Sequence, residues 1–299
     1  MISAETRAYL ELHVAVFLWG FTAILGDWIA LSALVLVWWR VFLTPLSLLP
    51  FSRAATLLQD VGRAQLLRFL GIGAVTGLHW LTFYGAIKLA NASIALICLA
   101  TTSFFSSLLE PLLLRRRFRP LDTAVGLLIL PGILLIVRGT AASLNLGILV
   151  GLASAFLAAL FTVLNKKYIE RTDPIRITFV EMIGALGLLS LLLPFFLART
   201  PAAHFWPAPQ DWLLLLILAL ACTTFTFVLS LRSLRHLSAF SANLTVNLEP
   251  VYGILLAYFL LNDGRELTPR FYLGVLIVLV AVFSHPVITR VLRRRNFSG

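Results

Sequence analysis

Three charged side chains lie inside long apolar stretches of the sequence: Arg40, Glu181 and Glu249. Because charge is costly at the depth of a bilayer, each should face a cavity or a partner. A guanidinium offers a paired donor fork that can clamp a carboxylate, and a deep carboxyl can bind a proton or a cation and couple two fluxes. The structural alternatives are an ion pair or carbonyl anchor for Arg40, and packing hydrogen bonds for the two acids, beside Pro250 in the case of Glu249.

A face that is both polar and aromatic is predicted on residues 66–87. Four residues recur there at spacings of one to four: Thr76, His79, Trp80 and Phe83. On a helix this spacing places them on adjoining parts of one side. Because a histidine facing lipid would be costly, we expect His79 to line a cavity, with the aromatic rings as stacking walls. The alternative is a packed interface in which His79 bonds to a neighbouring backbone.

Neutral polar side chains mark two later stretches. Thr226 belongs to a group of hydroxyls in residues 211–233, and Asn243 and Asn247 stand one turn apart. Hydroxyls and amides donate and accept without charge, so they suit a zwitterionic or neutral polar ligand, but such groups also hold membrane helices together. We expect them to converge with the aromatic face on a polar centre.

The composition sets the solvent in which these groups work. Hydrophobic residues make up 60% of the 299 residues and charged residues 12%, against about 45–50% and 25% in ordinary soluble domains. The formal charge of +11 does not indicate nucleic acid, because the Lys and Arg residues punctuate apolar runs. Metal-ligand spacings, phosphate loops and nucleophile motifs are missing from the sequence, which predicts no enzyme, no metal and no cofactor.

Runs of roughly 17 to 25 mostly apolar residues predict an all-α membrane protein with ten transmembrane helices. The predicted ranges are 9–26, 32–50, 66–87, 91–114, 121–138, 147–168, 176–198, 211–233, 238–261 and 270–289.

The Lys and Arg residues predict the orientation of these helices. With the N-terminus inside, eighteen of the 24 fall on the inner side, five on the outer side, and Arg40 within a helix. Because cytoplasmic loops carry the excess of Lys and Arg, both termini are expected to be cytoplasmic. The run from Arg115 to Arg119 is expected to contact anionic membrane lipid.

The chain also resembles itself at half its length. A shift of 148 places Ala90 on Ser238, and a shift near 140 places Thr22 on Thr162. Five helices per half is an odd number, so the second half must enter the membrane from the opposite side, which gives two inverted five-helix repeats. The predicted halves are residues 1–140, with helices one to five, and residues 141–299, with helices six to ten and a basic C-terminal tail.

Three short motifs occur in a specific order along these helices. They are Phe-Leu-Trp-Gly-Phe at 17–21, Trp-Arg-Val-Phe at 39–42 and Asn-Leu-Glu-Pro-Val-Tyr at 247–252. Together they resemble the drug/metabolite transporter superfamily in its ten-helix EamA-type form, over almost the whole chain, and the aromatic-rich helices look most like the YddG-type aromatic amino-acid exporters. Where the second half has Glu249-Pro250, the first half offers Thr101-Thr102.

The resemblance implies a secondary transporter that exports small metabolites, above all amino acids including aromatic ones. Export would cross the plasma membrane, the inner membrane in a bacterium, by alternating access around a central cavity. A multidrug or organic-cation efflux carrier is the alternative, because aromatic pockets also bind cations, and a channel fits less well, because aromatic-blocked helices favour occlusion. We expect a monomer with a small-molecule substrate. The expected cavity residues are Trp19, Arg40, Thr76, His79, Trp80, Phe83, Thr101, Thr226, Asn243 and Asn247, with Glu181 and Glu249 for coupling.

Overall fold

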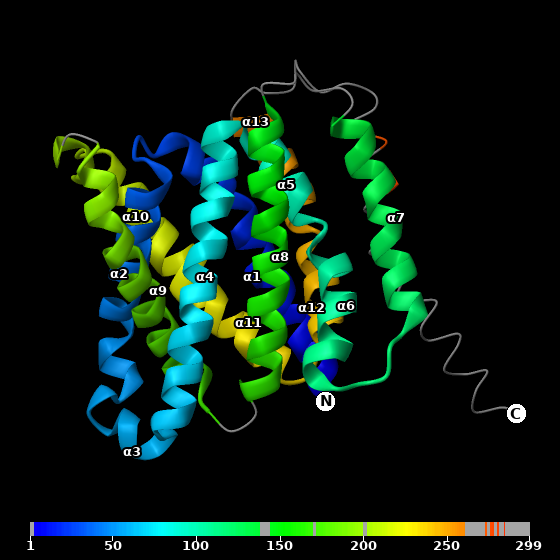
Figure 1. The fold of residues 1–299 in the computed structure, drawn as a ribbon, viewed down its shortest axis with the longest axis horizontal. Coiled ribbons are helices and arrows are strands. Elements are labelled where there is room, and N and C mark those ends of the chain that lie inside the picture. Colours follow the sequence, from blue (N-terminus) through cyan, green and yellow to red (C-terminus); the bar gives the residue numbers. More distant parts are fainter. Residues whose placement is uncertain are drawn as a thin grey trace, which may run out of the picture.

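The computed structural model describes residues 3–137, 144–169, 172–199 and 202–260 and a few single positions beyond them. All the regular elements in these residues are helices, arranged as an upright bundle (Figure 1). The predicted tenth helix, 270–289, lies outside the continuously described residues.

Seven helical stretches of the described residues are long and apolar enough to cross a membrane. They are α1 (Ala4–Trp28), α2 (Ala33–Ser52), α4 (Arg63–Leu89), the stretch Ile94–Leu114, α8 (Asn145–Tyr168), α9 (Pro174–Leu197) and the stretch Asp211–Leu234. The remaining helices outside the C-terminal part are α3 (Leu57–Val61), α7 (Pro120–Val137) and two short 3-10 turns, Ala54–Thr56 and Ala202–Phe205.

Three ranges predicted as single helices are interrupted in the structure. The first range, 91–114, consists of α5 and α6, and the last, 238–261, contains α12 and α13. In the middle range, 211–233, a wider π-helical segment separates α10 from α11. Their bounds are α5 Ala92–Leu99, α6 Thr102–Leu114, α10 Asp211–Ala219, the π segment Leu220–Phe225, α11 Thr226–Leu234, α12 Ala239–Val246 and α13 Glu249–Leu260.

Hydroxyl side chains account for the interruption between α5 and α6. Thr101 donates to the Cys98 carbonyl oxygen over 2.7 Å, and Thr102 donates to that of Leu99 over 2.6 Å. Ser103 likewise donates to the Ala100 carbonyl. Three successive side chains thus compete with backbone N–H groups for carbonyls three residues earlier, which favours a bend over a continuous helix.

Proline accounts for the interruption between α12 and α13. Pro250 has no N–H to donate to the carbonyl four residues earlier, that of Val246, and α12 ends at Val246. In the π segment, Thr223 and Thr224 instead donate their hydroxyls to carbonyls five residues earlier, over 2.6 and 2.8 Å. The two hydroxyls therefore donate to carbonyls at the same five-residue spacing as the backbone bonds of a π-helix.

Two of the three interrupted ranges, α5–α6 and α12–α13, correspond to each other along the sequence, and we call these the two interrupted helices. Their starts, the ends of their first pieces and the starts of their second pieces each lie 147 positions apart: 92 and 239, 99 and 246, 102 and 249. Even their N-caps, Asn91 and Ser238, keep this spacing. In Figure 1 the chain descends from α5 to α6 but ascends from α12 to α13, so the corresponding segments run in opposite directions.

The central helix α4 packs against both α8 and α9. At the crossing with α9, Gly73 lies against the backbone of Glu181, and Gly184 lies against the backbone of Leu70. A Cβ atom at either glycine would overlap these backbone atoms. The absence of side chains therefore allows the two helix backbones to approach closely.

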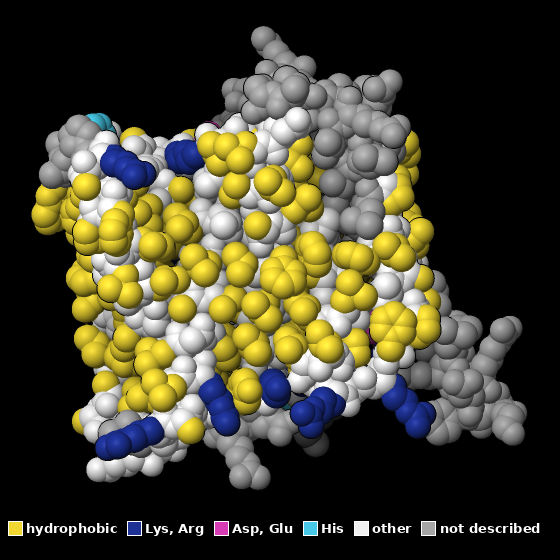
Figure 2. All heavy atoms as spheres, viewed as in Figure 1, with side chains coloured by type: hydrophobic (Ala, Val, Ile, Leu, Met, Phe, Trp, Pro, Cys, Tyr) yellow, Lys and Arg dark blue, Asp and Glu magenta, His cyan; other side chains and the backbone are white. Residues whose placement is uncertain are grey.

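The surface is consistent with a lipid environment. Hydrophobic side chains cover the middle of the face in Figure 2, and Lys and Arg gather mainly along the edge at which the N-terminus lies. Large apolar side chains such as Leu112, Leu191 and Phe195 are more than 70% exposed. Outward apolar surface of this extent requires an apolar solvent.

Candidate functional site

A cavity of about 70 Å³ lies where the two interrupted helices meet. One pair of residues at each interruption lines it, Leu99 with Thr102 and Val246 with Glu249. The other lining residues come from α1, α2, α4, α8, α11 and α12. One buried water needs roughly 10–15 Å³, so this cavity holds several waters in the conformation described, and a ligand of amino-acid size requires its lining to open further.

Aromatic rings form much of the cavity wall. Trp19, Trp80, Phe83, Phe161 and Phe227 all line it. The Phe161 ring lies 6.2 Å from that of Phe227, which lies 5.9 Å from that of Trp80, measured between centroids. These distances are typical of interacting rings, so the wall offers both flat faces and ring edges to a ligand.

Arg40 is buried and held by several groups at once. Its Nε donates to the Thr223 hydroxyl over 2.6 Å, its Nη1 to the Tyr84 hydroxyl over 3.1 Å, and its Nη2 to the Cys222 carbonyl over 3.4 Å. The guanidinium carbon lies 4.0 Å from the centroid of the Trp80 ring. Arg40 therefore anchors the π segment and one cavity wall while still lining the cavity.

His79 is fixed by α8. Its Nδ1 lies 3.0 Å from the carbonyl oxygen and 2.9 Å from the hydroxyl of Ser154, and that hydroxyl also lies 3.1 Å from the His79 carbonyl. Donation to the carbonyl requires the proton on Nδ1, which leaves Nε2 free to accept a hydrogen bond. His79 thus combines the two sequence-based alternatives, a backbone contact and a place in the cavity lining.

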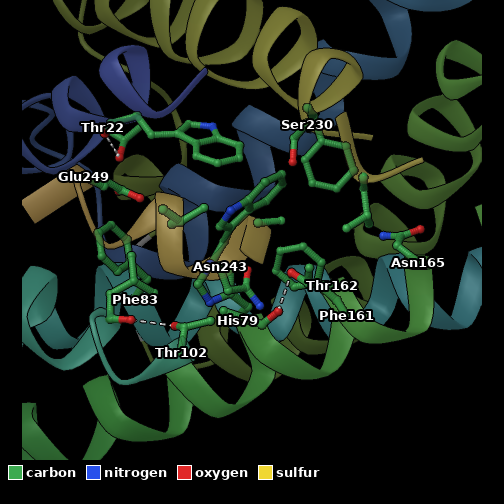
Figure 3. Close-up of a pocket in the computed structure, with 18 of the residues that line it drawn as sticks. Thr22, His79, Phe83, Thr102, Phe161, Thr162, Asn165, Ser230, Asn243 and Glu249 are labelled. Carbon is green, nitrogen blue, oxygen red and sulfur yellow. Dashed lines mark hydrogen bonds between the residues drawn. The ribbon is translucent and has the colours of Figure 1, made fainter. Parts of the chain in front are cut away.

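Glu249 is the acidic residue of the cavity. It is the first residue of α13 and is 5% exposed. Figure 3 shows it with Thr22 at one end of the pocket and Asn165 at the other. Neither Glu249 nor Arg40 belongs to any of the ion pairs found within the described residues.

Four of the expected cavity residues are buried but lie outside the cavity lining. Thr76 donates to the Ile72 carbonyl, Thr101 to that of Cys98 and Thr226 to that of Thr223. Asn247 donates from Nδ2 to the Ser103 hydroxyl over 2.8 Å. The three threonines thus bond to backbone carbonyls of their own helical segments, and Asn247 bonds to a side chain of another helix. Thr102, the neighbour of Thr101, lines the cavity instead. Six other expected residues line the cavity together: Trp19, Arg40, His79, Trp80, Phe83 and Asn243.

Glu181, the other expected coupling residue, also lies outside the lining and is 0% exposed. Asn165, which lines the cavity, connects to it: Asn165 Nδ2 donates to Glu181 Oε2 over 3.3 Å.

Several lining residues were not expected from the sequence. They are Thr22, Phe161, Thr162, Asn165 and Phe227, together with apolar neighbours. The shift near 140 that places Thr22 on Thr162 could have identified both as cavity residues. Ser230 belongs to the group of hydroxyls at helical spacing in residues 211–233, which the sequence did mark, whereas Asn165 lies beside Lys166 at the end of an apolar run and no spacing in the sequence marks it.

Known proteins resemble this chain in fold or in sequence. The model of the EamA-like transporter family matches residues 6–138 and 145–284. An uncharacterized transporter of Archaeoglobus fulgidus is 28% identical over 224 residues, which cover 73% of this chain and 74% of that protein. A solved structure described only as the crystal structure of a protein has a TM-score of 0.73 and 18% identity, covering 95% of this chain and 97% of the other, and shows the fold alone. The chain thus belongs to the EamA-like transporter family, and it is a multi-pass membrane protein.

Proposed function

We propose that the protein is a secondary carrier that exports small metabolites, above all amino acids including aromatic ones, by exposing the central cavity alternately to the two sides of the membrane. The observation that carries this proposal is the position of the cavity at the meeting point of two interrupted helices. Discontinuous helices at the interface of inverted repeats form the substrate sites of many secondary transporters.

The correspondence between the interrupted helices supports an inverted repeat of residues 1–140 and 141–299. Leu99 and Thr102 in the first half correspond to Val246 and Glu249 in the second, and all four line the cavity. The corresponding segments run in opposite directions (Figure 1). A cavity built from equivalent parts of two opposed halves can open to either side by rocking one half against the other.

The chemistry of the lining suits a zwitterion with an aromatic side chain. Glu249 can pair with an ammonium group, and the N–H groups of Arg40 that have no partner among the described residues can donate to a carboxylate. Rings such as those of Trp80 and Phe83 can hold an aromatic side chain. Neutral donors and acceptors complete the site: Thr102, Ser230 and Asn243.

A specific observation favours organic cations as a second candidate substrate. Arg40 already donates to three protein groups, whereas Glu249 has no ion-pair partner within the described part of the chain. A cavity with an available acid and several ring faces also attracts cations that lack a carboxylate.

We place the protein in the plasma membrane, the inner membrane in a bacterium, with the basic edge of the molecule on the cytoplasmic side. The cavity would then lie towards the cytoplasm. The cavity lining extends to Leu234 at the end of α11 and to Asn165 near the end of α8. Lys166 and Arg235, which adjoin these helix ends, belong to the predicted cytoplasmic side. We take a monomer as the transporting unit.

A binding screen tests the substrate class. In a thermal-shift assay of purified protein, aromatic amino acids should raise the apparent melting temperature by ligand linkage. Trp80→Ala and Glu249→Gln should lose this shift, whereas Leu191→Ala, on the lipid-facing surface, should keep it. An identical shift in the Trp80→Ala and Glu249→Gln variants would contradict binding in this cavity. Shifts with organic cations but not with amino acids would favour the second candidate.

A further inference from the structure

A buried polar pair adjoins the cavity at the end opposite Glu249. Asn165 of α8 and Glu181 of α9 are 1% and 0% exposed, and Asn165 Nδ2 donates to Glu181 Oε2 over 3.3 Å. Asn165 lines the cavity and Glu181 lies behind it (Figure 3 labels Asn165). The amide therefore separates a fully buried carboxyl from the cavity space.

Each residue of this pair has one acceptor oxygen that receives no hydrogen bond. Glu181 Oε1 and Asn165 Oδ1 both have no hydrogen-bond partner in the described residues. A buried, unpaired acceptor costs about 1–3 kcal/mol, and an isolated buried carboxylate costs considerably more. One proton on the carboxyl would remove the negative charge and supply an O–H donor at the same time.

Positive charge from the neighbouring helices does not reach Glu181. At its level α4 presents Gly73, which leaves no space for a side chain, and α8 presents Asn165, which is neutral. No ion pair within the described residues includes Glu181. Ionisable side chains of the helices around it make contacts elsewhere. On α2 and α4 these contacts are Arg40 with Thr223, Arg68 with Gln65, His79 with Ser154 and Lys88 with the Ile29 carbonyl. On α8, α9 and α11 they are Lys166 with the Leu234 carbonyl, Lys167 with the Tyr168 ring, Arg176 with Asp60 and Arg232 with Glu11.

We propose that Glu181 is a proton-binding site of the carrier, reached from the cavity through Asn165 and separate from the substrate-facing Glu249. When the Asn165 side chain moves aside, a hydronium ion from the cavity transfers its proton to Glu181 Oε1; the products are a neutral carboxyl and water. The reverse transfer, when the cavity faces the other side, releases the proton there. This assignment of the coupling site rests on the proposed carrier function, but proton binding itself does not.

Infrared difference spectroscopy tests proton binding without any substrate. Full-length protein in lipid bilayers is compared between acidic and alkaline pH, in wild type, Glu181→Gln and Glu249→Gln. We expect a protonated-carboxyl band that wild type and Glu249→Gln share and that Glu181→Gln lacks. In Asn165→Leu the band should shift, because its hydrogen-bond partner is lost. Identical spectra for wild type and a Glu181→Gln variant that elutes as one species and unfolds cooperatively would overturn the proposal.

A transport arm separates coupling from the carrier function. Liposomes containing the protein are tested with a labelled aromatic amino acid, with and without an imposed pH gradient. In wild type the gradient should accelerate flux several-fold; Glu181→Gln should lose this acceleration and keep exchange of labelled for unlabelled substrate. Equal acceleration in the variant would overturn the proposal. So would wild-type flux that stops when choline replaces sodium. If neither wild type nor the variant exchanged labelled for unlabelled substrate, the proposed function would be contradicted. The infrared result would still decide whether Glu181 binds a proton.

Discussion

Arg40 is fixed by too many groups to act as a freely moving ligand clamp. Its contacts with Thr223, Tyr84 and the Cys222 carbonyl hold the widened part of the α10–α11 stretch, and its planar face lies against Trp80. We therefore interpret Arg40 first as a residue that positions the cavity wall. Its effect on a substrate carboxylate depends on that position.

Replacing Arg40 by Lys separates charge from geometry. Lys keeps the positive charge but cannot reproduce the planar fork or the stacking on Trp80. Hydrogen bonds to charged groups each contribute about 1.5–3 kcal/mol, so we expect Arg40→Lys to lower both the apparent melting temperature and the transport rate. Arg117→Lys, at an exposed loop position, is the matched control and should behave as wild type. Equal melting temperatures for Arg40→Lys and wild type would contradict the anchor role.

Asp60 gives the fold a pH-dependent contact outside the membrane-spanning helices. Its carboxylate accepts hydrogen bonds from Thr56 over 2.8 Å and Arg176 over 2.7 Å, and these bonds hold the pKa of Asp60 below its ordinary value. A lowered folded-state pKa contributes stability above the unfolded pKa of about 3.9, and this stability is lost as pH falls through the folded pKa.

The consequence is testable with Asp60→Asn. At neutral pH the variant should unfold at a lower temperature than wild type, by a small amount because the group is exposed to solvent. In acid, below the folded-state pKa, the two proteins should unfold together. Thermal unfolding measured over a pH series checks this, and a difference that stays constant at every pH would count against it.

The sequence located part of the cavity because ionisable and aromatic residues are conspicuous in apolar runs. Arg40, His79 and Glu249 could be selected from the sequence for this reason, and all three line the cavity. Periodicity selects a helix face but does not reveal which neighbour covers each part of it, so Thr76 and Thr226 lie on packed contacts instead. Thr101 and Thr102 differ by one residue, and only the bend between α5 and α6 decides that Thr102 faces the cavity.

At the scale of elements, the lengths of apolar runs predicted nine of the helical ranges that the structure describes, but not their interruptions. Hydropathy measures transfer from water and does not register competition for backbone carbonyls. The hydroxyls of Thr101 to Ser103 supply that competition in one case, and in the other Pro250 lacks the N–H that a continuous helix needs. Both signals are visible in the sequence once backbone hydrogen bonds are counted.

The crossing of α4 and α9 predicts opposite effects for neighbouring glycines. A Cβ at Gly73 or Gly184 would overlap the backbone of the other helix, whereas a Cβ at Gly71 or Gly187 would meet no atom of another described helix within 4 Å. Overpacking typically costs about 1–3 kcal/mol. We expect Gly73→Ala and Gly184→Ala to lower the apparent melting temperature, and Gly71→Ala and Gly187→Ala to leave it unchanged or slightly raised. A uniform response of all four variants would show that the crossing is not as close as described.

At the scale of the whole molecule, the distribution of Lys and Arg predicts which loops face the cytoplasm. Single cysteines at Arg117 and Gln210, both exposed, lie on the predicted inner and outer sides. A membrane-impermeant thiol reagent applied to intact cells should label Gln210→Cys and should reach Arg117→Cys only after permeabilisation. The native Cys98 and Cys222 are buried and should stay unlabelled. The reverse labelling pattern would invert the topology.

The central claim is that the cavity between the two halves carries substrate by alternating access. Carriers and channels of the same fold differ in one kinetic property: in a carrier, substrate on one side accelerates entry from the other, because the loaded cavity returns to the outside. Counterflow in liposomes measures this property directly.

Liposomes preloaded with unlabelled aromatic amino acid should transiently accumulate the labelled form above its equilibrium level. Trp80→Ala should abolish this accumulation, and Leu191→Ala should preserve it. Simple equilibration that is independent of preloading, or accumulation that survives in Trp80→Ala, would contradict a carrier that works through this cavity.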